Sequence, residues 1–165
     1  GVSSAASDVY KRQLLYINRN NAETKRYQEE GLKLLSGKVD SLPSKIAFRP
    51  KFIKQSSCIK VFDKLYLFIS KANIKKPLEE RFDALFHEIG HWLHFQNIPP
   101  LKECREIWKT ANLEKIKEDV SEYAVKKDDG REFVAEVFKG LIKGKKYDEY
   151  IMNLYKRLHG PVPHD

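Results

Sequence analysis

The sequence predicts an α+β fold, because short β-type segments precede a series of longer helical segments. Residues 46–48, 58–62 and 65–70 are rich in β-branched and aromatic side chains, as short strands are. Apolar side chains at helical spacing dominate the rest of the chain, where prolines and glycines interrupt them. We therefore expect a small antiparallel or mixed sheet that is followed by several helices.

The segment before the strands predicts a first helix over residues 21–36. Its apolar side chains include Tyr27, and Gly37 is a typical C-terminal stop. Between the second and third strands, Asp63-Lys64 predicts a tight hairpin turn, although the glycine that such turns favour is missing.

Four further helices are predicted after the strands. They cover residues 77–96, 101–117, 132–143 and 147–158. Pro77 opens the first of them, and the pair Pro99-Pro100 separates the first from the second, since proline suits the first turn of a helix.

The composition indicates a globular protein rather than a disordered one. The chain has 165 residues, of which 41% are hydrophobic and 33% charged, and this length is typical of a single domain. The net charge of +8 comes mainly from scattered lysines, and no nucleic-acid-binding motif accompanies them. We interpret these lysines as a solvated surface and do not expect a nucleic-acid partner.

The cysteines and the apolar segments point to a cytoplasmic protein. Cys58 and Cys104 lack the spacing of a metal knuckle or a redox motif, so we expect two buried free thiols in a reducing compartment. No apolar run is long enough to span a membrane, and no secretory signal is visible.

The first residues are interpreted separately from the fold. Residues 1–13 begin without methionine and resemble translated vector or adapter sequence. We interpret residues 1–13 as a non-native or disordered segment and residues 14–165 as one domain. A further hypothesis is that the chain is the C-terminal piece of a longer protein.

The run His87-Glu88-Ile89-Gly90-His91 is the strongest functional signal in the sequence. Two histidines four residues apart share one helix face, so both imidazoles can reach one metal ion. Zinc suits imidazole nitrogens, and a catalytic zinc takes three protein ligands and one water. Glu88 is placed to take a proton from that water, a spacing that is typical of zinc peptidases.

The helix around this motif is apolar on nearly every side, which predicts a buried helix. Its apolar side chains are Leu85, Phe86, Ile89, Trp92, Leu93 and Phe95. Buried histidines need partners, because an unpaired buried polar group is costly. In the alternative interpretation, His87 and His91 are hydrogen-bonded core histidines and Glu88 is a solvated helix residue. The specificity of the motif favours the metal site.

A third zinc ligand must come from elsewhere in the chain. His94 lies about 10 Å along the helix axis from His87, too far to share a metal, so we expect a second-shell or packing role for it. Glu132 and Glu136 are four residues apart on a later helix. One carboxylate can bind zinc while the other accepts the free ring N–H of a ligand histidine. Alternatively, Asp129 and Glu132 form a capping box at the start of that helix.

The chain resembles the gluzincin peptidases, which pair this histidine motif with a later glutamate. It is most similar to compact domains of the anthrax lethal-factor type, including the Pro-Pro endopeptidases, and to metallopeptidase-like domains of phages and mobile elements. Those domains carry Ser-x-Tyr-Ala, a polar loop and Glu-x-Phe-Ala-Glu, which residues 121–124 and 132–136 of this chain resemble. The resemblance implies a compact zincin fold in which the motif helix is the active-site helix.

The resemblance also implies a role for each site residue. The zinc ligands are His87, His91 and Glu132, and Glu88 is the general base. Tyr123 donates a hydrogen bond to the transition state, and Glu136 is the second-shell partner. In the family pattern the tyrosine precedes the glutamate by seven residues, whereas Tyr123 precedes Glu132 by nine. A tyrosine that is simply packed beside the core is the alternative.

These residues predict a zinc-dependent endopeptidase that acts on a peptide or protein substrate, in the cytoplasm or associated with a phage particle. We expect the strand at residues 65–70 to be an edge strand that binds an extended peptide, with an ordinary core strand as the alternative. Other interpretations are a repressor-cleaving phage-type peptidase (ImmA/IrrE type), an inert or structural zinc-binding domain of a phage-type protein, and a nucleic-acid-associated peptidase.

Overall fold

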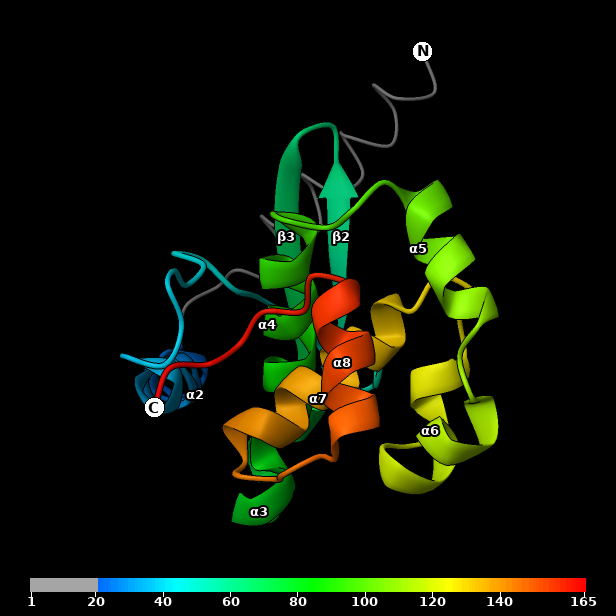
Figure 1. Cartoon of the computed structure of the whole chain (residues 1–165). Helices are drawn as coiled ribbons and strands as arrows, with labels where there is room; N and C mark the ends of the chain where they lie inside the picture. Colours follow the sequence, from blue (N-terminus) through cyan, green and yellow to red (C-terminus); the bar gives the residue numbers. More distant parts are fainter. Residues whose placement is uncertain (1–20) are drawn as a thin grey trace. The chain divides into compact units, whose positions relative to one another are not determined.

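The computed structural model describes residues 21–165, so the interpretation of residues 1–13 lies outside the described residues. The described chain forms two compact units, and Figure 1 draws their helices and strands. One unit comprises residues 21–34 and 43–85, and the other comprises residues 35–42 and 86–165. The first unit holds the strands and the second holds most of the helices, so the α+β class is confirmed. The single domain over residues 14–165 stays a prediction.

The sheet of the first unit has three strands in the order β1-β3-β2, namely β1 (Ala47–Arg49), β3 (Lys64–Ser70) and β2 (Ser57–Val61). β1 runs parallel to β3, and β2 runs antiparallel to it. The sheet is therefore mixed, as the sequence predicted.

β3 is the central strand, and the prediction of an edge strand at residues 65–70 is wrong. β1 pairs with Phe68–Ser70 on one side of β3, and β2 pairs with residues 64–68 on the other. Leu67, Phe68 and Ile69 are buried. Every residue of β3 already pairs with a neighbouring strand on at least one side, so β3 is the central strand of this sheet and not an edge strand. The alternative, an ordinary core strand, describes it.

The hairpin turn lies one residue earlier than predicted. Val61 pairs with Lys64, so Phe62 and Asp63 form the two-residue turn. Phe62 has a φ of 57° and is 65% exposed. Two-residue hairpin turns need positive φ angles to match the twist of the strands, and here a phenylalanine adopts one without the usual glycine or asparagine.

The helices of the first unit pack through an aromatic contact. Tyr27 of α2 (Ala22–Leu35) stacks on Phe82 with ring centroids 4.9 Å apart, and its hydroxyl donates a hydrogen bond to the Arg81 carbonyl. A short 3₁₀ helix, η1 (Lys71–Lys75), follows β3, and α3 (Leu78–Arg81) comes next. The predicted helix over residues 77–96 is interrupted, because Phe82 ends α3 before α4 begins.

The second unit consists of helices. They are α4 (Asp83–Phe95), which begins in the first unit, α5 (Leu101–Lys109), α6 (Leu113–Asp119), the 3₁₀ helix η2 (Tyr123–Val125), α7 (Arg131–Ile142) and α8 (Glu149–Arg157). The single helix predicted over residues 101–117 is wrong. Asn112 caps a new helix there, because its side chain accepts the backbone N–H of Lys115.

α7 forms the centre of the second unit's core. Phe133, Val134, Val137 and Phe138 are fully buried, and Phe133 packs against Trp108 of α5. Burial of such side chains contributes about 1.5–3 kcal/mol each. α7 is therefore a fixed support for the polar side chains at its start.

The burial of the two cysteines and the length of the apolar helices can be compared with the sequence predictions. Cys104 is buried as expected, whereas Cys58 is only half-buried, and no disulfide joins them. Within residues 21–165, no helix is long and apolar enough to cross a membrane.

Candidate metal centre

α4 carries a buried group of metal-binding side chains. His87, Glu88 and His91 each offer one ligand atom, and these atoms lie within 4.8 Å of one another. Glu88 is only 5% exposed, so the interpretation of Glu88 as a solvated helix residue is wrong. This group could hold a metal ion.

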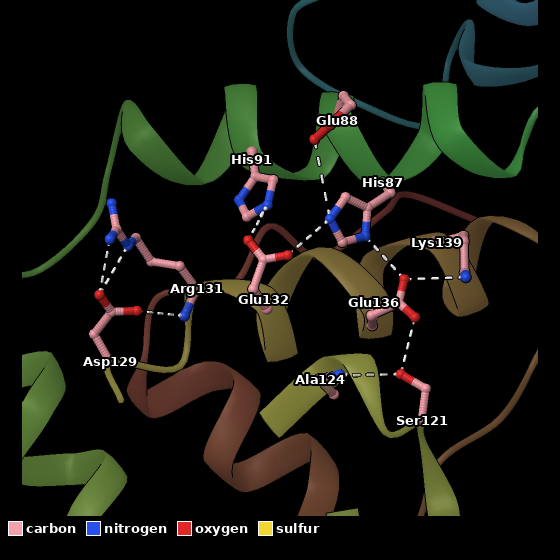
Figure 2. A network of polar contacts seen from close by, with 10 residues as sticks. All are labelled: His87, Glu88, His91, Ser121, Ala124, Asp129, Arg131, Glu132, Glu136 and Lys139. Atoms are coloured by element: carbon pink, nitrogen blue, oxygen red, sulfur yellow. Dashed lines mark hydrogen bonds and ion pairs between the residues drawn. The ribbon is translucent and has the colours of Figure 1, made fainter. Parts of the chain in front are cut away.

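Glu132 of α7 completes a three-residue cluster with the two histidines (Figure 2). Its Oε2 lies 3.1 Å from Nε2 of His87, and its Oε1 lies 2.8 Å from Nε2 of His91. Oε1 of Glu88 is 4.0 Å from Nε2 of His87. Glu132 is thus the carboxylate nearer to both imidazoles, while Glu88 stands beside them.

Gly90 allows α4 to approach α7 closely enough for these contacts. A Cβ atom at Gly90 would lie 3.1 Å from the Ala135 Cα and 3.1 Å from a ring carbon of Phe138. Ala135 lies between Glu132 and Glu136 on α7. A residue without a side chain therefore stands where the two helices bring the histidines and the carboxylates together.

Glu136 holds the other side of the His87 ring. His87 donates its Nδ1–H to Oε2 of Glu136 at 2.8 Å. Oε1 of Glu136 accepts the hydroxyl of Ser121 at 2.9 Å, and Lys139 lies 3.0 Å from Oε2. Ser121 and Lys139 thus hold the Glu136 carboxylate, and its contact with Nδ1 orients the His87 ring.

Ser121 and Lys139 were not predicted as site residues. Ser121 belongs to the Ser-x-Tyr-Ala stretch, so its position in a motif was a signal that could have found it. Lys139 lies three residues after Glu136 on α7, a spacing at which helical side chains meet.

The carboxylates change the protonation of His87. Burial alone would lower the pKa of His87, but the hydrogen bonds with Glu132 and Glu136 raise it to about 9. Burial alone would raise the pKa of the Glu136 carboxyl, but its contacts with His87 and Lys139 lower this pKa to about 2. The pKa of Glu132 also falls below its ordinary value, because its bonds to His87 and His91 outweigh its burial. Without a metal, the carboxylates therefore stabilise the protonated, positively charged form of His87.

Tyr123 of η2 lies against His87. The two ring centroids are 5.4 Å apart in an edge-on arrangement, and Tyr123 is 45% exposed. Burial, followed by the negative charges of Glu132 and Glu88, raises the pKa of the Tyr123 hydroxyl to about 12. Tyr123 therefore keeps its proton at neutral pH, and it lies against His87 at the edge of the cluster, partly open to solvent.

His94 has a packing role. Its Nε2–H donates a hydrogen bond of 2.7 Å to the Leu158 carbonyl just after α8, and the ring is buried. Burial lowers the pKa of His94 to about 4, although the Leu158 carbonyl opposes that shift. Of the two roles expected for His94, the structure supports packing, because its ring nitrogen joins α4 to the end of α8.

The capping-box alternative for Glu132 is wrong. Gly130, with a φ of 77°, stands at the N-cap of α7. Asp129 accepts the backbone N–H of Arg131 and pairs with its guanidinium. The Glu132 carboxylate does not turn back to the helix start, because it contacts the two histidines instead.

No family model, curated protein sequence or solved structure matches this chain. The resemblance to the gluzincin peptidases therefore depends on the motif residues alone and stays a hypothesis. Function has to be inferred from the chemistry of the cluster around His87.

Proposed function

We propose that this protein is a zinc-dependent endopeptidase. The observation that supports the proposal is the meeting of three potential ligands from two helices. Nε2 of His87 and Nε2 of His91 each lie about one hydrogen-bond length from a different oxygen of Glu132. Two imidazole nitrogens and one carboxylate form a ligand set typical of catalytic zinc, which leaves a fourth position for water.

The surroundings of the cluster fit a metal ion in two further respects. His87 already has a carboxylate on its Nδ1, as metal-ligating histidines almost always do. The three carboxylates Glu88, Glu132 and Glu136 supply the negative charge that a divalent cation would balance. Within the described residues, Nδ1 of His91 is buried without a hydrogen-bond partner, so the cluster orients His91 less firmly than His87.

The chain's own residues would divide the work of hydrolysis. Bound zinc supplies Lewis acidity, polarising a peptide carbonyl and lowering the pKa of a water molecule. Glu88, buried beside His87, would take a proton from the attacking water and pass it to the leaving amine. Tyr123, which keeps its proton because its pKa is about 12, would donate a hydrogen bond to the oxyanion.

The zinc content of the purified protein tests the ligand set. Elemental analysis should find about one zinc per chain in the wild type and a marked loss in Glu132→Ala. The matched control is Glu118→Ala, which removes an exposed helix carboxylate outside the cluster and should keep full zinc. Absence of zinc from the wild type after zinc has been added back would overturn the proposal. Full zinc in Glu132→Ala would remove Glu132 from the ligand set.

Peptidase activity is tested separately from metal binding. The zinc-loaded wild type should cleave members of a quenched fluorescent peptide library, and chelation should abolish the signal. A protein that binds one zinc but cleaves no peptide would instead be an inert zinc-binding domain, and the endopeptidase proposal would fail.

A further inference from the structure

A second feature of the helical unit is a hollow of about 540 Å³. α5, the start of α6 and the segment 125–128 enclose it. Five of its lining side chains are cationic, namely Lys102, Arg105, Lys109, Lys126 and Lys127, whereas Glu106 and Asp128 are its acidic ones. Four of the chain's lysines and one arginine, all within residues 102–127, thus lie around one concave surface.

Most of this positive charge is not neutralised inside the protein. Arg105 has only a long contact of 3.9 Å with Asp128. In the part of the chain that the structure describes, Lys102, Lys109 and Lys127 have no carboxylate within ion-pair distance, and all three are exposed. An anionic ligand would therefore find free cations there.

The inner wall of the hollow is apolar. Trp108 and Leu113 line it, and Trp108 is fixed in place by its packing on Phe133. A peptide that alternates carboxylates with apolar side chains matches both the rim and the wall. A nucleic-acid strand matches less well, because Glu106 and Asp128 would repel its continuous phosphates. Trp108 is also only 6% exposed, so its ring is not open for base stacking.

The hollow and the candidate metal centre both involve the segment that contains η2. Val125 of η2 lines it, and Tyr123 of the same 3₁₀ turn contacts His87. Lys126, which also lines the hollow, has its Nζ 5.2 Å from the centre of the Tyr123 ring. Residues 123–126 therefore connect the lining of the hollow with the edge of the metal centre.

We propose that this hollow is a docking site for an acidic, partly apolar peptide segment. Its role as a substrate subsite rests on the proposed peptidase function, but binding of the segment does not. The lysine and arginine side chains would hold the carboxylates, and Leu113, which is 41% exposed, would contact the apolar side chains. As a substrate subsite, the hollow would favour substrates with glutamate or aspartate near the cleaved bond.

Binding is measured by fluorescence anisotropy with a labelled peptide in which glutamate alternates with leucine. The protein carries Glu88→Gln, so that the peptide stays intact, and is used both zinc-loaded and chelator-treated. The double variant Lys102→Glu/Lys109→Glu should weaken binding about tenfold, since two attractive charges become repulsive. The matched control, Lys146→Glu/Lys156→Glu, makes the same change in net charge outside the hollow and should lose less than about threefold.

Three results would overturn this proposal. The first is equal binding of a peptide with glutamine in place of glutamate. The second is an equal loss in the two double variants, which would indicate an effect of net charge alone. The third is tighter binding of a single-stranded oligonucleotide, lost only in Lys102→Glu/Lys109→Glu, which would identify a nucleic-acid site. Failure to bind zinc leaves the chelator-treated measurement valid, so the two proposals can fail independently.

Discussion

The two ends of α4 place histidines in opposite chemical surroundings. His87 and His94 are seven residues apart, two helical turns along the same face. Two carboxylates of α7 surround His87 and raise its pKa to about 9, whereas His94 donates to a backbone carbonyl in an apolar core and has a pKa of about 4. The partner helix thus decides whether a buried histidine on this face attracts or excludes positive charge.

The largest expected effect is at the part of α4 that carries His87 and Glu88. Glu88→Gln should lower peptide hydrolysis about a hundredfold to ten-thousandfold, because the amide cannot take a proton. Zinc content should stay at the wild-type level, since Glu88 lies beside the proposed ligands and is not one of them. Hydrolysis rates and elemental analysis of the same preparation measure both, with Glu118→Gln as the control. Wild-type-like activity in Glu88→Gln would contradict the mechanism.

The part of α4 that carries His94 should make the free energy of unfolding sensitive to acid. The pKa of His94 in the folded protein, about 4, is lower than the unfolded value near 6.5, so the unfolded state binds the proton more tightly. The stability contributed by His94 is complete above pH 6.5 and falls by about 3 kcal/mol as the pH drops toward 4. His94→Gln, which keeps a donor for the Leu158 carbonyl, should remove that part of the pH dependence.

Urea unfolding at a series of pH values measures this effect. The control is His159→Asn, which removes an exposed histidine at a position with a φ of 61° that asparagine tolerates. It should leave the acid dependence unchanged. An unchanged pH profile in His94→Gln would show that other groups cause the loss of stability.

A moderate effect is expected behind the metal ligands. Glu136→Ala removes the acceptor of the His87 Nδ1–H and should weaken zinc binding about tenfold to a hundredfold. Ser121→Ala should have a smaller effect in the same direction, because it removes only the hydrogen bond to Oε1 of Glu136 and leaves the contacts of Oε2 in place. Competition with a zinc-binding dye gives both affinities. An affinity within twofold of the wild type in Glu136→Ala would show that His87 does not depend on it.

The smallest effect is expected between the two ends of α4, at Gly90. Overpacking by the new methyl group of Gly90→Ala should cost about 1–3 kcal/mol, partly offset by the higher helix propensity of alanine. α4 and α7 must then separate by a few tenths of an ångström. We therefore expect a small fall in the unfolding midpoint and a several-fold weaker affinity for zinc. Tighter zinc binding in this variant would exclude Gly90 as the residue that brings the helices together.

The sequence determined the features that depend on local geometry. The spacing of His87 and His91, and that of Glu132 and Glu136, places each pair on one helix face wherever the helix lies. The apolar residues around them predicted that both helices are buried. The strand segments were found for a similar reason, since β-branched and aromatic runs are local signals.

Only the tertiary structure decided how these local pieces meet. It placed β3 at the centre of the sheet, directed Ser121 to Glu136, and arranged five cationic side chains from two helical segments and a loop around one hollow. It also gave His94 a core carbonyl rather than a carboxylate as its partner. Such contacts join residues far apart in the sequence, and they depend on packing between elements, which residue spacing within one element does not encode.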